Sequence, residues 1–319
     1  MRVLCKAHRS LLTTHCWRLR LNLNLNLNLN LRLMKYFTAI FLLISLHSFA
    51  QKPAYVLSNP AGKEVGWTTF IDQLAAADIV FIGEYHNNPI CHWMEYEITA
   101  ALHEKKAGKI ILGAEMFESD NQLLLDEYLA GKIKQKNFED EAKLWNNYQT
   151  DYKPLIEFAK EKKLTFVASN IPRRYASMVA AGGFEALDSL SAGAKKLIAA
   201  LPMAYDENLN CYKSMMSMGG MGGGHANVNL PKAQASKDAT MAHFILKYFK
   251  PEYTFIHYNG SFHSDYSEGI AWYIKKENPA MKIIVISVSE VDDVLKPAPE
   301  DLNKGDYTIL VPATMTKTY

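Results

Sequence analysis

Two short segments of this 319-residue chain carry the residue types best suited to chemistry. Gly83-Glu84-Tyr85-His86 and Gly260-Ser261-Phe262-His263 both read G-x-x-H, and both follow an apolar run. Glycine lets the backbone turn sharply, so the histidine three residues later is expected to face back over the strand end. Two histidines with a carboxylate such as Glu84 form a set that binds a divalent metal. The same side chains equally form a polar site in which histidine donates a hydrogen bond or acts as general base.

Polar side chains also follow two further apolar runs. Glu115 comes after KIILGA, and Asn170 comes after LTFVAS. In a parallel sheet the carboxyl ends of the strands meet at one edge, where ligands bind. We therefore expect one polar cleft there. An unpaired buried carboxylate is costly, so Glu84 and Glu115 are expected to be partners of the histidines and to fix their tautomers.

The other histidines have different expected roles. His92 lies beside Trp93 in an expected helix, where it serves either the site or the packing. His257 lies inside an apolar run and is expected to be a satisfied core histidine. His103 and His243 read as ordinary helix residues.

Apolar runs that alternate with helix-like segments must position these groups. The runs contain β-branched residues without polar alternation, which is typical of strands buried on both faces. The expected strands are Asp78–Gly83, Lys109–Ala114, Leu164–Ser169, Tyr253–Tyr258, Lys282–Val288 and Tyr307–Val311, preceded by a small hairpin over Tyr55–Gly66. The expected helices are about Pro89–Lys106, Gln122–Ala130, Phe138–Leu144, Pro154–Lys163, Lys232–Phe249 and Gly269–Lys276, with a mostly helical stretch over Arg173–Leu201. The fold class is α/β, with a mainly parallel central sheet flanked by helices and a small helical subdomain at about 118–163.

A methionine- and glycine-rich segment, 211–231, is expected to be a flexible loop. Thioethers are soft ligands that suit copper(I) and also approach haem iron. The alternative is an insertion whose methionines pack loosely. The candidate ligands in this segment are Met215, Met216, Met218, Met221 and His225.

The first fifty residues read as a leader. Residues 34–50 have a basic start at Lys35, an apolar stretch and a small-residue cleavage signal, which together predict a secretory signal peptide. Cleavage after Ala50 leaves Gln51 first, and a lipoprotein signal would need cysteine there. The protein is therefore expected in the periplasm or secreted, without a lipid anchor. The two-residue repeat within 1–33 indicates a wrongly assigned start, with a genuine extension as the alternative.

Removing the leader changes the charge balance. Seven of the 35 basic residues and none of the 33 acidic ones lie in it, which leaves 28 basic residues and a net charge of −5. Such a chain has no electrostatic basis for binding nucleic acid. Only Cys91 and Cys211 remain, and a disulfide between them cannot be deduced.

Six ordered motifs resemble those of the ChaN-type haem-binding uptake proteins in the wider Tiki superfamily. They are Gly83-Glu84-Tyr85-His86-Asn87-Asn88-Pro89 with His92, Glu115-Met116-Phe117 followed by Asp126–Gly131, Trp145 with Tyr148, Tyr152, Pro154 and Leu155, Asn170-Ile171-Pro172-Arg173, Asp238–Ala242, and Asn259–His263 with Asp265, Tyr266 and Gly269. The resemblance covers roughly Ala54 to Val288. It implies a single haem-binding domain over 51–319.

The resemblance implies a non-catalytic haem protein in haem or iron acquisition. It implies ferric haem stacked between two subunits of a homodimer, with the iron held by a tyrosine; Tyr148 and Tyr152 are the candidates, since tyrosinate suits ferric iron. His86, His92 and His263 would complete the haem site, and an outer-membrane haem or siderophore receptor is an implied partner. The alternative is a metal-dependent hydrolase, in which Glu84 is general base or ligand and His86 and His263 bind a divalent metal.

Overall fold

The computed structural model describes residues 34–35, 52–219 and 227–319. The chain separates into two units, Met1–Pro53 and Ala54–Tyr319, and the fold described here is that of the second unit. Most of the predicted leader and signal peptide lies outside the described residues. Within the described residues, every helix is too short or too polar to span a lipid bilayer.

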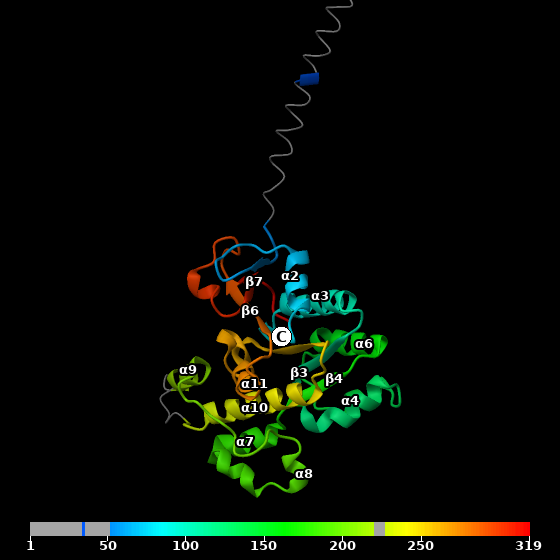
Figure 1. Cartoon of the computed structure of the whole chain (residues 1–319), viewed down its shortest axis with the longest axis vertical. Coiled ribbons are helices and arrows are strands. Elements are labelled where there is room, and N and C mark those ends of the chain that lie inside the picture. The colour runs from blue at the N-terminus through cyan, green and yellow to red at the C-terminus, as the bar shows by residue number, and fades with distance from the viewer. Residues whose placement is uncertain (1–33, 36–51, 220–226) are drawn as a thin grey trace, which may run out of the picture. The chain divides into compact units, whose positions relative to one another are not determined.

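One seven-stranded sheet forms the centre of the unit (Figure 1). Its order is β1-β7-β6-β2-β5-β3-β4, and all neighbours are parallel except the edge pair β1 and β7. The strands are β1 (Val56–Ser58), β2 (Ile79–Glu84), β3 (Ile110–Glu118), β4 (Phe166–Asn170), β5 (Thr254–Gly260), β6 (Ile283–Val291) and β7 (Tyr307–Pro312). The predicted α/β class with a mainly parallel sheet is confirmed.

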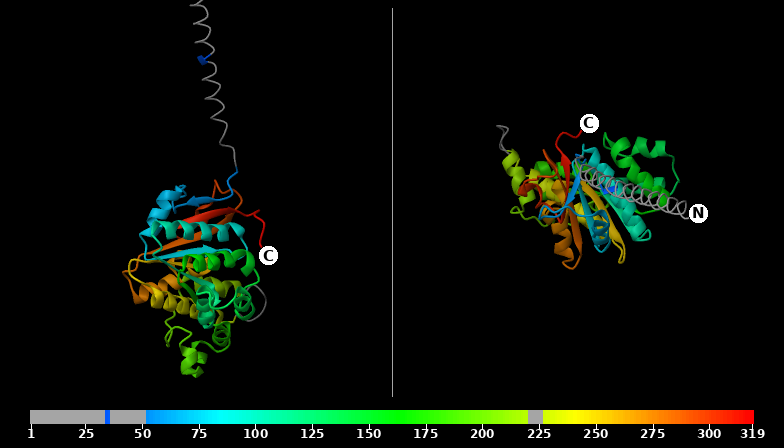
Figure 2. Two further views of the ribbon diagram at one scale, coloured as in Figure 1. Left: turned by 90° about the vertical axis from the view of Figure 1, so that its right-hand side faces the viewer. Right: turned by 90° about the horizontal axis from the view of Figure 1, so that it is seen from above.

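Helices cover both faces of the sheet, as the two further views show (Figure 2). The longer ones are α2 (Trp67–Ala75), α3 (Pro89–Lys105), α4 (Gln122–Leu129), α5 (Gln135–Glu141), α6 (Lys153–Lys162), α7 (Arg173–Gly182), α9 (Asn210–Gly219), α10 (Leu230–Tyr248) and α11 (Ile270–Glu277). Helix α8 (Ala192–Lys195) is a single turn. The segment between β3 and β4 holds α4, α5, a π-helical turn (Tyr148–Tyr152) and α6, which form the predicted helical subdomain.

Alternate residues of each strand enter different cores. Val80 and Ile82 of β2 pack with α2, α3 and α6, whereas Ile79 and Phe81 pack with α7, α10 and α11. A strand buried on both sides must be apolar at every position, and this explains the unbroken apolar runs in the sequence.

Three segments differ from expectation. The predicted loop over 211–231 is wrong for its first residues, because α9 occupies Asn210–Gly219; no glycine or proline interrupts the chain there until Gly219, and Met and Lys favour helix. The stretch expected to be mostly helical over Arg173–Leu201 is helical in separate pieces, because α7 ends at Gly182 and Gly183 has a φ of +75°. The expected front hairpin closes only through a bridge between Ser58 and Glu64, since β1 pairs instead with β7.

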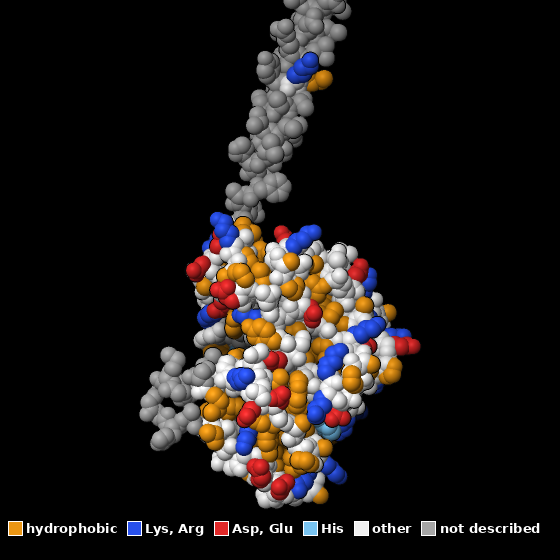
Figure 3. Space-filling view, turned by 60° about the vertical axis from the view of Figure 1, so that its left-hand side comes forward, with side chains coloured by type: hydrophobic (Ala, Val, Ile, Leu, Met, Phe, Trp, Pro, Cys, Tyr) orange, Lys and Arg blue, Asp and Glu red, His pale blue; other side chains and the backbone are white. Residues whose placement is uncertain are grey.

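The surface carries charges of both signs. On the face shown in Figure 3, acidic and basic side chains are interspersed and apolar side chains lie between them.

Candidate functional site

The strand order brings together residues that are far apart in the sequence. β5 lies between β2 and β3, so the carboxyl ends of these three parallel strands are adjacent. Glu84 ends β2, Gly260 ends β5, and Glu115 lies in β3 where its register against β4 shifts. A β-bulge of this kind re-aims a side chain. The convergence predicted from the strand ends is therefore a feature of the sheet.

An open pocket of about 530 Å³ lies at this edge. Its volume falls within the usual range of small-molecule sites, about 300–1,000 Å³. We call it the open pocket. Its lining is Glu84, Tyr85, His86, Asn87, Glu115, Met215, Gln234, Lys237, Gly260, Ser261, Phe262, His263 and Tyr319.

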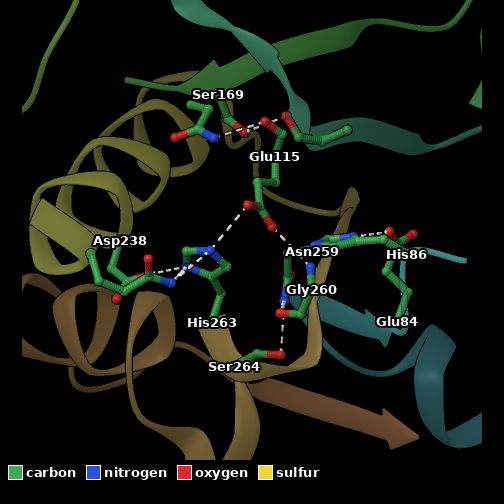
Figure 4. A network of polar contacts seen from close by, with 12 residues as sticks. Glu84, His86, Glu115, Ser169, Asp238, Asn259, Gly260, His263 and Ser264 are labelled. Carbon is green, nitrogen blue, oxygen red and sulfur yellow. Dashed lines mark hydrogen bonds and ion pairs between the residues drawn. The ribbon is translucent and has the colours of Figure 1, made fainter. Parts of the chain in front are cut away.

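The floor of the open pocket is a buried ion-paired group, the His263 cluster (Glu115, Asp238 and His263; Figure 4). His263 Nε2 lies 3.1 Å from Glu115 Oε1, and Nδ1 forms a short contact with Asp238 Oδ1. The second oxygen of Glu115 accepts the Gly260 N–H at 2.9 Å. Both ring nitrogens thus face a carboxylate, which favours a doubly protonated His263; the side-chain amide of Gln234, 2.9 Å from Nε2, must then present its oxygen to that N–H.

The pKa values of the His263 cluster follow from this arrangement. Burial alone would lower the pKa of His263, but the charges of Glu115 and Asp238 and their hydrogen bonds raise it to about 9. Burial would likewise raise the pKa of Glu115, yet the charge and hydrogen bond of His263 hold it well below its usual range. A histidine protonated at neutral pH has no lone pair to offer, so His263 is neither a metal ligand nor a general base in this state.

His86 differs because one of its ring nitrogens stays available. Its Nδ1 lies 2.5 Å from Glu84 Oε1, and its side chain is 36% exposed. The ring packs edge-on against Trp145, with 4.9 Å between centroids. Burial would lower the pKa of His86, but the hydrogen bond and charge of Glu84 raise it overall. The carboxylate fixes the tautomer and leaves Nε2 toward Gly260 and the open pocket.

The glycines of the two G-x-x-H segments serve close approach and not a sharp turn. Neither Gly83 nor Gly260 is among the residues with positive φ. A Cβ on Gly260 would lie 2.9 Å from His86 Cε1, and one on Gly83 would lie 3.0 Å from the Ile286 carbonyl oxygen. The predicted reason for these glycines is therefore wrong, because what requires them is the tight packing of β5 and β6 around β2.

His92 lies on the far side of Glu84 from His86, in a second buried group that we call the His92 cluster (Glu84, His92 and Glu95). His92 Nδ1 lies 3.4 Å from Glu84 Oε2 and 3.3 Å from Glu95 Oε2. Its Nε2 lies 3.1 Å from the His86 carbonyl oxygen and 3.4 Å from Asp151. His92 is therefore packed in the interior, beneath the open pocket and not in its lining.

The two candidate iron ligands are buried in the helical subdomain. Tyr148 and Tyr152 are each 2% exposed, and neither lines the open pocket. The Tyr152 hydroxyl donates to Glu84 Oε1 at 2.8 Å, whereas the Tyr148 hydroxyl has no hydrogen-bond partner among the described residues. Burial raises the pKa of both phenols. The prediction that one of them binds iron stays a prediction.

The remaining predicted residues have plain positions. Asn170 donates to the Glu115 carbonyl oxygen at 2.9 Å and so supports the pocket floor from β4. His257 bonds Ser169 and Asn259 and is the satisfied core histidine that was expected. Cys91 and Cys211 are free thiols.

The methionine segment is only partly described. Met215 lines the open pocket, and Met216 is 40% exposed on α9. Met221 and His225 lie outside the described residues, as does the side chain of Met218. The predicted copper(I) set therefore stays untested.

Some site residues were missed by sequence reasoning. Glu95 lies three residues after His92, so both occupy one face of α3, and this spacing was a usable signal. Asp238 appears in a matched motif, but nothing in the sequence pairs it with His263. Tyr85, Lys237 and Tyr319 reach the open pocket only through the tertiary fold.

Comparisons with known proteins bear on the family and the fold of this chain. The family model described as "Haem-binding uptake, Tiki superfamily, ChaN" matches residues 70–274. A solved structure described as cofacial haem binding to ChaN of Campylobacter jejuni covers 81% of this chain and 96% of its own, with 19% identity and a TM-score of 0.63. An erythromycin esterase variant in its open conformation covers 82% of this chain and 98% of its own, with 9% identity and a TM-score of 0.48. No curated protein matches this chain.

Proposed function

Because this chain belongs to the ChaN family of haem-binding uptake proteins in the Tiki superfamily, we propose that it binds ferric haem at the open pocket and serves haem or iron uptake. The observation that carries the placement is the pocket itself, which lies at the carboxyl edge of the parallel sheet and offers oriented polar groups.

The side chains around the open pocket suit the parts of a haem. Phe262 is 38% exposed and, with Met215, gives the porphyrin plane an apolar contact. Lys237 supplies a cation for the carboxylates of the propionates. His86 presents Nε2, and Glu84 on the opposite nitrogen makes that lone pair a better iron ligand or hydrogen-bond acceptor.

We propose a tyrosine as the ligand of ferric iron, in line with the family resemblance. Tyr85 and Tyr319 are the phenols that line the open pocket as described. Tyr148 and Tyr152 would need the π-helical turn to open before either could reach haem. We therefore place Tyr85 first, since it also belongs to the loop that positions His86.

A haemin titration of five single variants tests this proposal. Tyr85→Phe, Tyr319→Phe, Tyr148→Phe and Tyr152→Phe are compared with Tyr96→Phe, a control on α3 that is 37% exposed and outside the open pocket. We expect wild type and the control to show a tyrosinate-to-iron charge-transfer band, and Tyr85→Phe to lose it. Loss in Tyr148→Phe or Tyr152→Phe alone moves the ligand into the helical subdomain. If wild type binds no haem, the proposed function is wrong.

Assembly and location follow as further parts of the proposal. A homodimer that sandwiches haem, export to the periplasm or beyond, and delivery from an outer-membrane haem or siderophore receptor rest on the resemblance and on residues 34–50. Ultracentrifugation with and without haemin tests the dimer: a shift to twice the mass on adding haemin supports it.

The metal-dependent hydrolase is the weaker alternative. It needs a lone pair from His263 as well as from His86, and both nitrogens of His263 face carboxylates. We therefore do not propose it.

A further inference from the structure

We propose that the His92 cluster is a buried binding site for a divalent zinc-like cation, adjoining the open pocket and sharing Glu84 with it. Its donors are His92 Nδ1, Glu84 Oε2 and one oxygen of Glu95, and these atoms lie within 4.8 Å of one another. The inference does not rest on haem binding.

The first step concerns the tautomer of His92. Its Nε2 lies 3.1 Å from the backbone carbonyl oxygen of His86 and 3.4 Å from Asp151 Oδ2. A carbonyl oxygen only accepts, so Nε2 carries the hydrogen. Metal-binding histidines usually donate their second ring N–H to a carbonyl or carboxylate in this way. The other nitrogen, Nδ1, is then the one that faces the two glutamates.

The second step concerns Glu84, whose two oxygens have different surroundings. Oε1 accepts the Tyr152 hydroxyl at 2.8 Å and contacts His86 Nδ1. Oε2 has no hydrogen-bond partner among the described residues, although the side chain is fully buried and this atom faces His92. A buried carboxylate oxygen without a donor is costly. Glu95 Oε1 also has no donor among these residues, and burial and the charge of Glu84 raise the pKa of Glu95, so that without a metal the two carboxyls share a proton.

The third step is the spacing. Nδ1 lies 3.4 Å from one carboxylate oxygen and 3.3 Å from the other, which is long for a strong hydrogen bond to either. In a tetrahedral zinc site with bonds of about 2.0–2.1 Å, neighbouring donor atoms lie about 3.3–3.4 Å apart. The two distances from Nδ1 therefore match the edges of a four-coordinate site, the third pair of donor atoms lies within 4.8 Å, and Glu95 Oε1 is available as a further donor.

The fourth step is charge. The His92 cluster sets two glutamates against one histidine, and Asp151 adds a third carboxylate at the other ring nitrogen. No Lys or Arg is paired with Glu84, Glu95 or Asp151 among the described residues. A divalent cation would replace the proton held between Glu84 and Glu95 and neutralise both carboxylates.

Burial determines how the ion enters. The side chains of Glu84 and Glu95 are fully buried, and that of His92 is 5% exposed. The ion is therefore loaded as the chain folds and exchanges slowly afterwards. A test must unfold the protein in the presence of a chelator and refold it with and without added Zn²⁺.

Zinc content after such refolding, measured by elemental analysis after desalting, is the decisive quantity. We expect about one equivalent of Zn²⁺ in wild type and less than about one tenth in Glu95→Gln and in His92→Gln. We expect the control Glu157→Gln, which changes a carboxylate bonded to Tyr128 in the helical subdomain, to keep the wild-type content. Wild type refolded with zinc should melt roughly 5 °C or more above the zinc-free form.

Two results would overturn the proposal. One is wild-type protein that refolds to the same circular dichroism spectrum and holds no zinc, since the cluster would then be completed by a proton. The other is equal zinc in wild type and in both cluster variants, which would place the ion elsewhere. Circular dichroism of each variant shows whether it has folded, and the wild-type zinc content decides the question even if neither cluster variant folds.

Discussion

His92 and His263 are both buried among carboxylates, yet their ring nitrogens face different atoms. In the His263 cluster each nitrogen faces its own carboxylate, at 3.1 Å and at a short contact. At His92 one nitrogen faces a backbone carbonyl at 3.1 Å and Asp151 at 3.4 Å, and the other is shared between two glutamate oxygens at 3.3 and 3.4 Å.

This difference shows that the same residue types carry different chemistry according to how the histidine is oriented. A proton on each nitrogen completes the His263 cluster, which is therefore a self-contained ion pair. The His92 cluster instead brings two glutamate oxygens to one ring nitrogen, and the proton that Glu84 and Glu95 share is what the proposed cation would replace. Composition alone would have classed both as metal sites.

The largest expected effect is a difference between the two clusters in how removing one carboxylate changes the free energy of unfolding. Glu115→Gln should lower the free energy of unfolding by about 3–5 kcal/mol, because it leaves a buried cation with one partner and disturbs the bond from Gly260. Glu95→Gln in zinc-free protein should cost far less, because burial and the charge of Glu84 raise the pKa of Glu95 well above its usual range, and the amide of glutamine resembles the protonated carboxyl. Urea unfolding of both variants measures this, and equal losses would remove the distinction.

The next effect is the dependence of stability on pH at the His263 cluster. The pKa of His263 is raised from 6.5 to about 9, so its contribution is complete below about pH 6.5 and is lost as the pH rises through 9. The loss between pH 7 and 10 should approach about 3 kcal/mol.

The pH measurement needs a subtraction. The lysines, tyrosines and cysteines away from this cluster titrate alike in wild type and in His263→Gln. The difference between the two proteins in the free energy of unfolding therefore reports on His263 and its neighbours Glu115, Asp238, His86 and Lys237. An unchanged difference from pH 7 to 10 would show that His263 is not held as a cation. In acid the sign reverses, because Glu115 has a lowered pKa and its contribution disappears as the pH falls.

A smaller effect concerns the close packing of Gly260 against His86. Gly260→Ala puts a Cβ 2.9 Å from His86 Cε1 and should cost about 1–3 kcal/mol. Because His86 is displaced from the open pocket, haemin affinity should fall as well. Gly66→Ala is the matched control, since nothing lies within 4 Å of its added Cβ. Similar behaviour of the two variants would show that His86 has room to move.

The smallest effect compares two tyrosines on one π-helical turn. Tyr152→Phe removes the donor to Glu84 Oε1 and should cost about 1–2 kcal/mol. Tyr148→Phe removes a buried hydroxyl that has no hydrogen-bond partner among the described residues, and it should be neutral or slightly stabilising. Thermal unfolding of both variants at one pH ranks them, and the reverse order would contradict the described hydroxyl contacts.

Much of this architecture could be predicted because it depends on local pattern. Unbroken apolar runs such as Ile79–Glu84 predicted strands buried on both faces, and the residues after them predicted a polar edge. The same reasoning failed at 211–231, where glycine content was taken to describe a segment whose first residues favour helix. Glycine was also read as a turn former at Gly260, where its lack of a side chain is what matters.

Pairings within the site could not be predicted, because they depend on strand order. Nothing local states that β5 inserts between β2 and β3, so the contact of Glu115 with His263 has no signature in the sequence. The pairing of His92 with Glu95 was within reach through their helical spacing, but whether an i, i+3 pair is buried depends on what covers the helix. Tyrosine burial in the helical subdomain likewise required the tertiary fold.

The position of β5 in the sheet also determines when, during synthesis, the sheet and the open pocket can form. The ribosome makes β2 and β3 well before β5, and until Thr254–Gly260 arrives those two strands have no neighbour between them and expose unpaired backbone edges. The contacts that finally close the sheet span long stretches of chain, which slows folding. Shortened products that stop before β5 therefore lack both the floor of the open pocket and a complete sheet. We expect such products to aggregate or to be degraded and to bind no ligand.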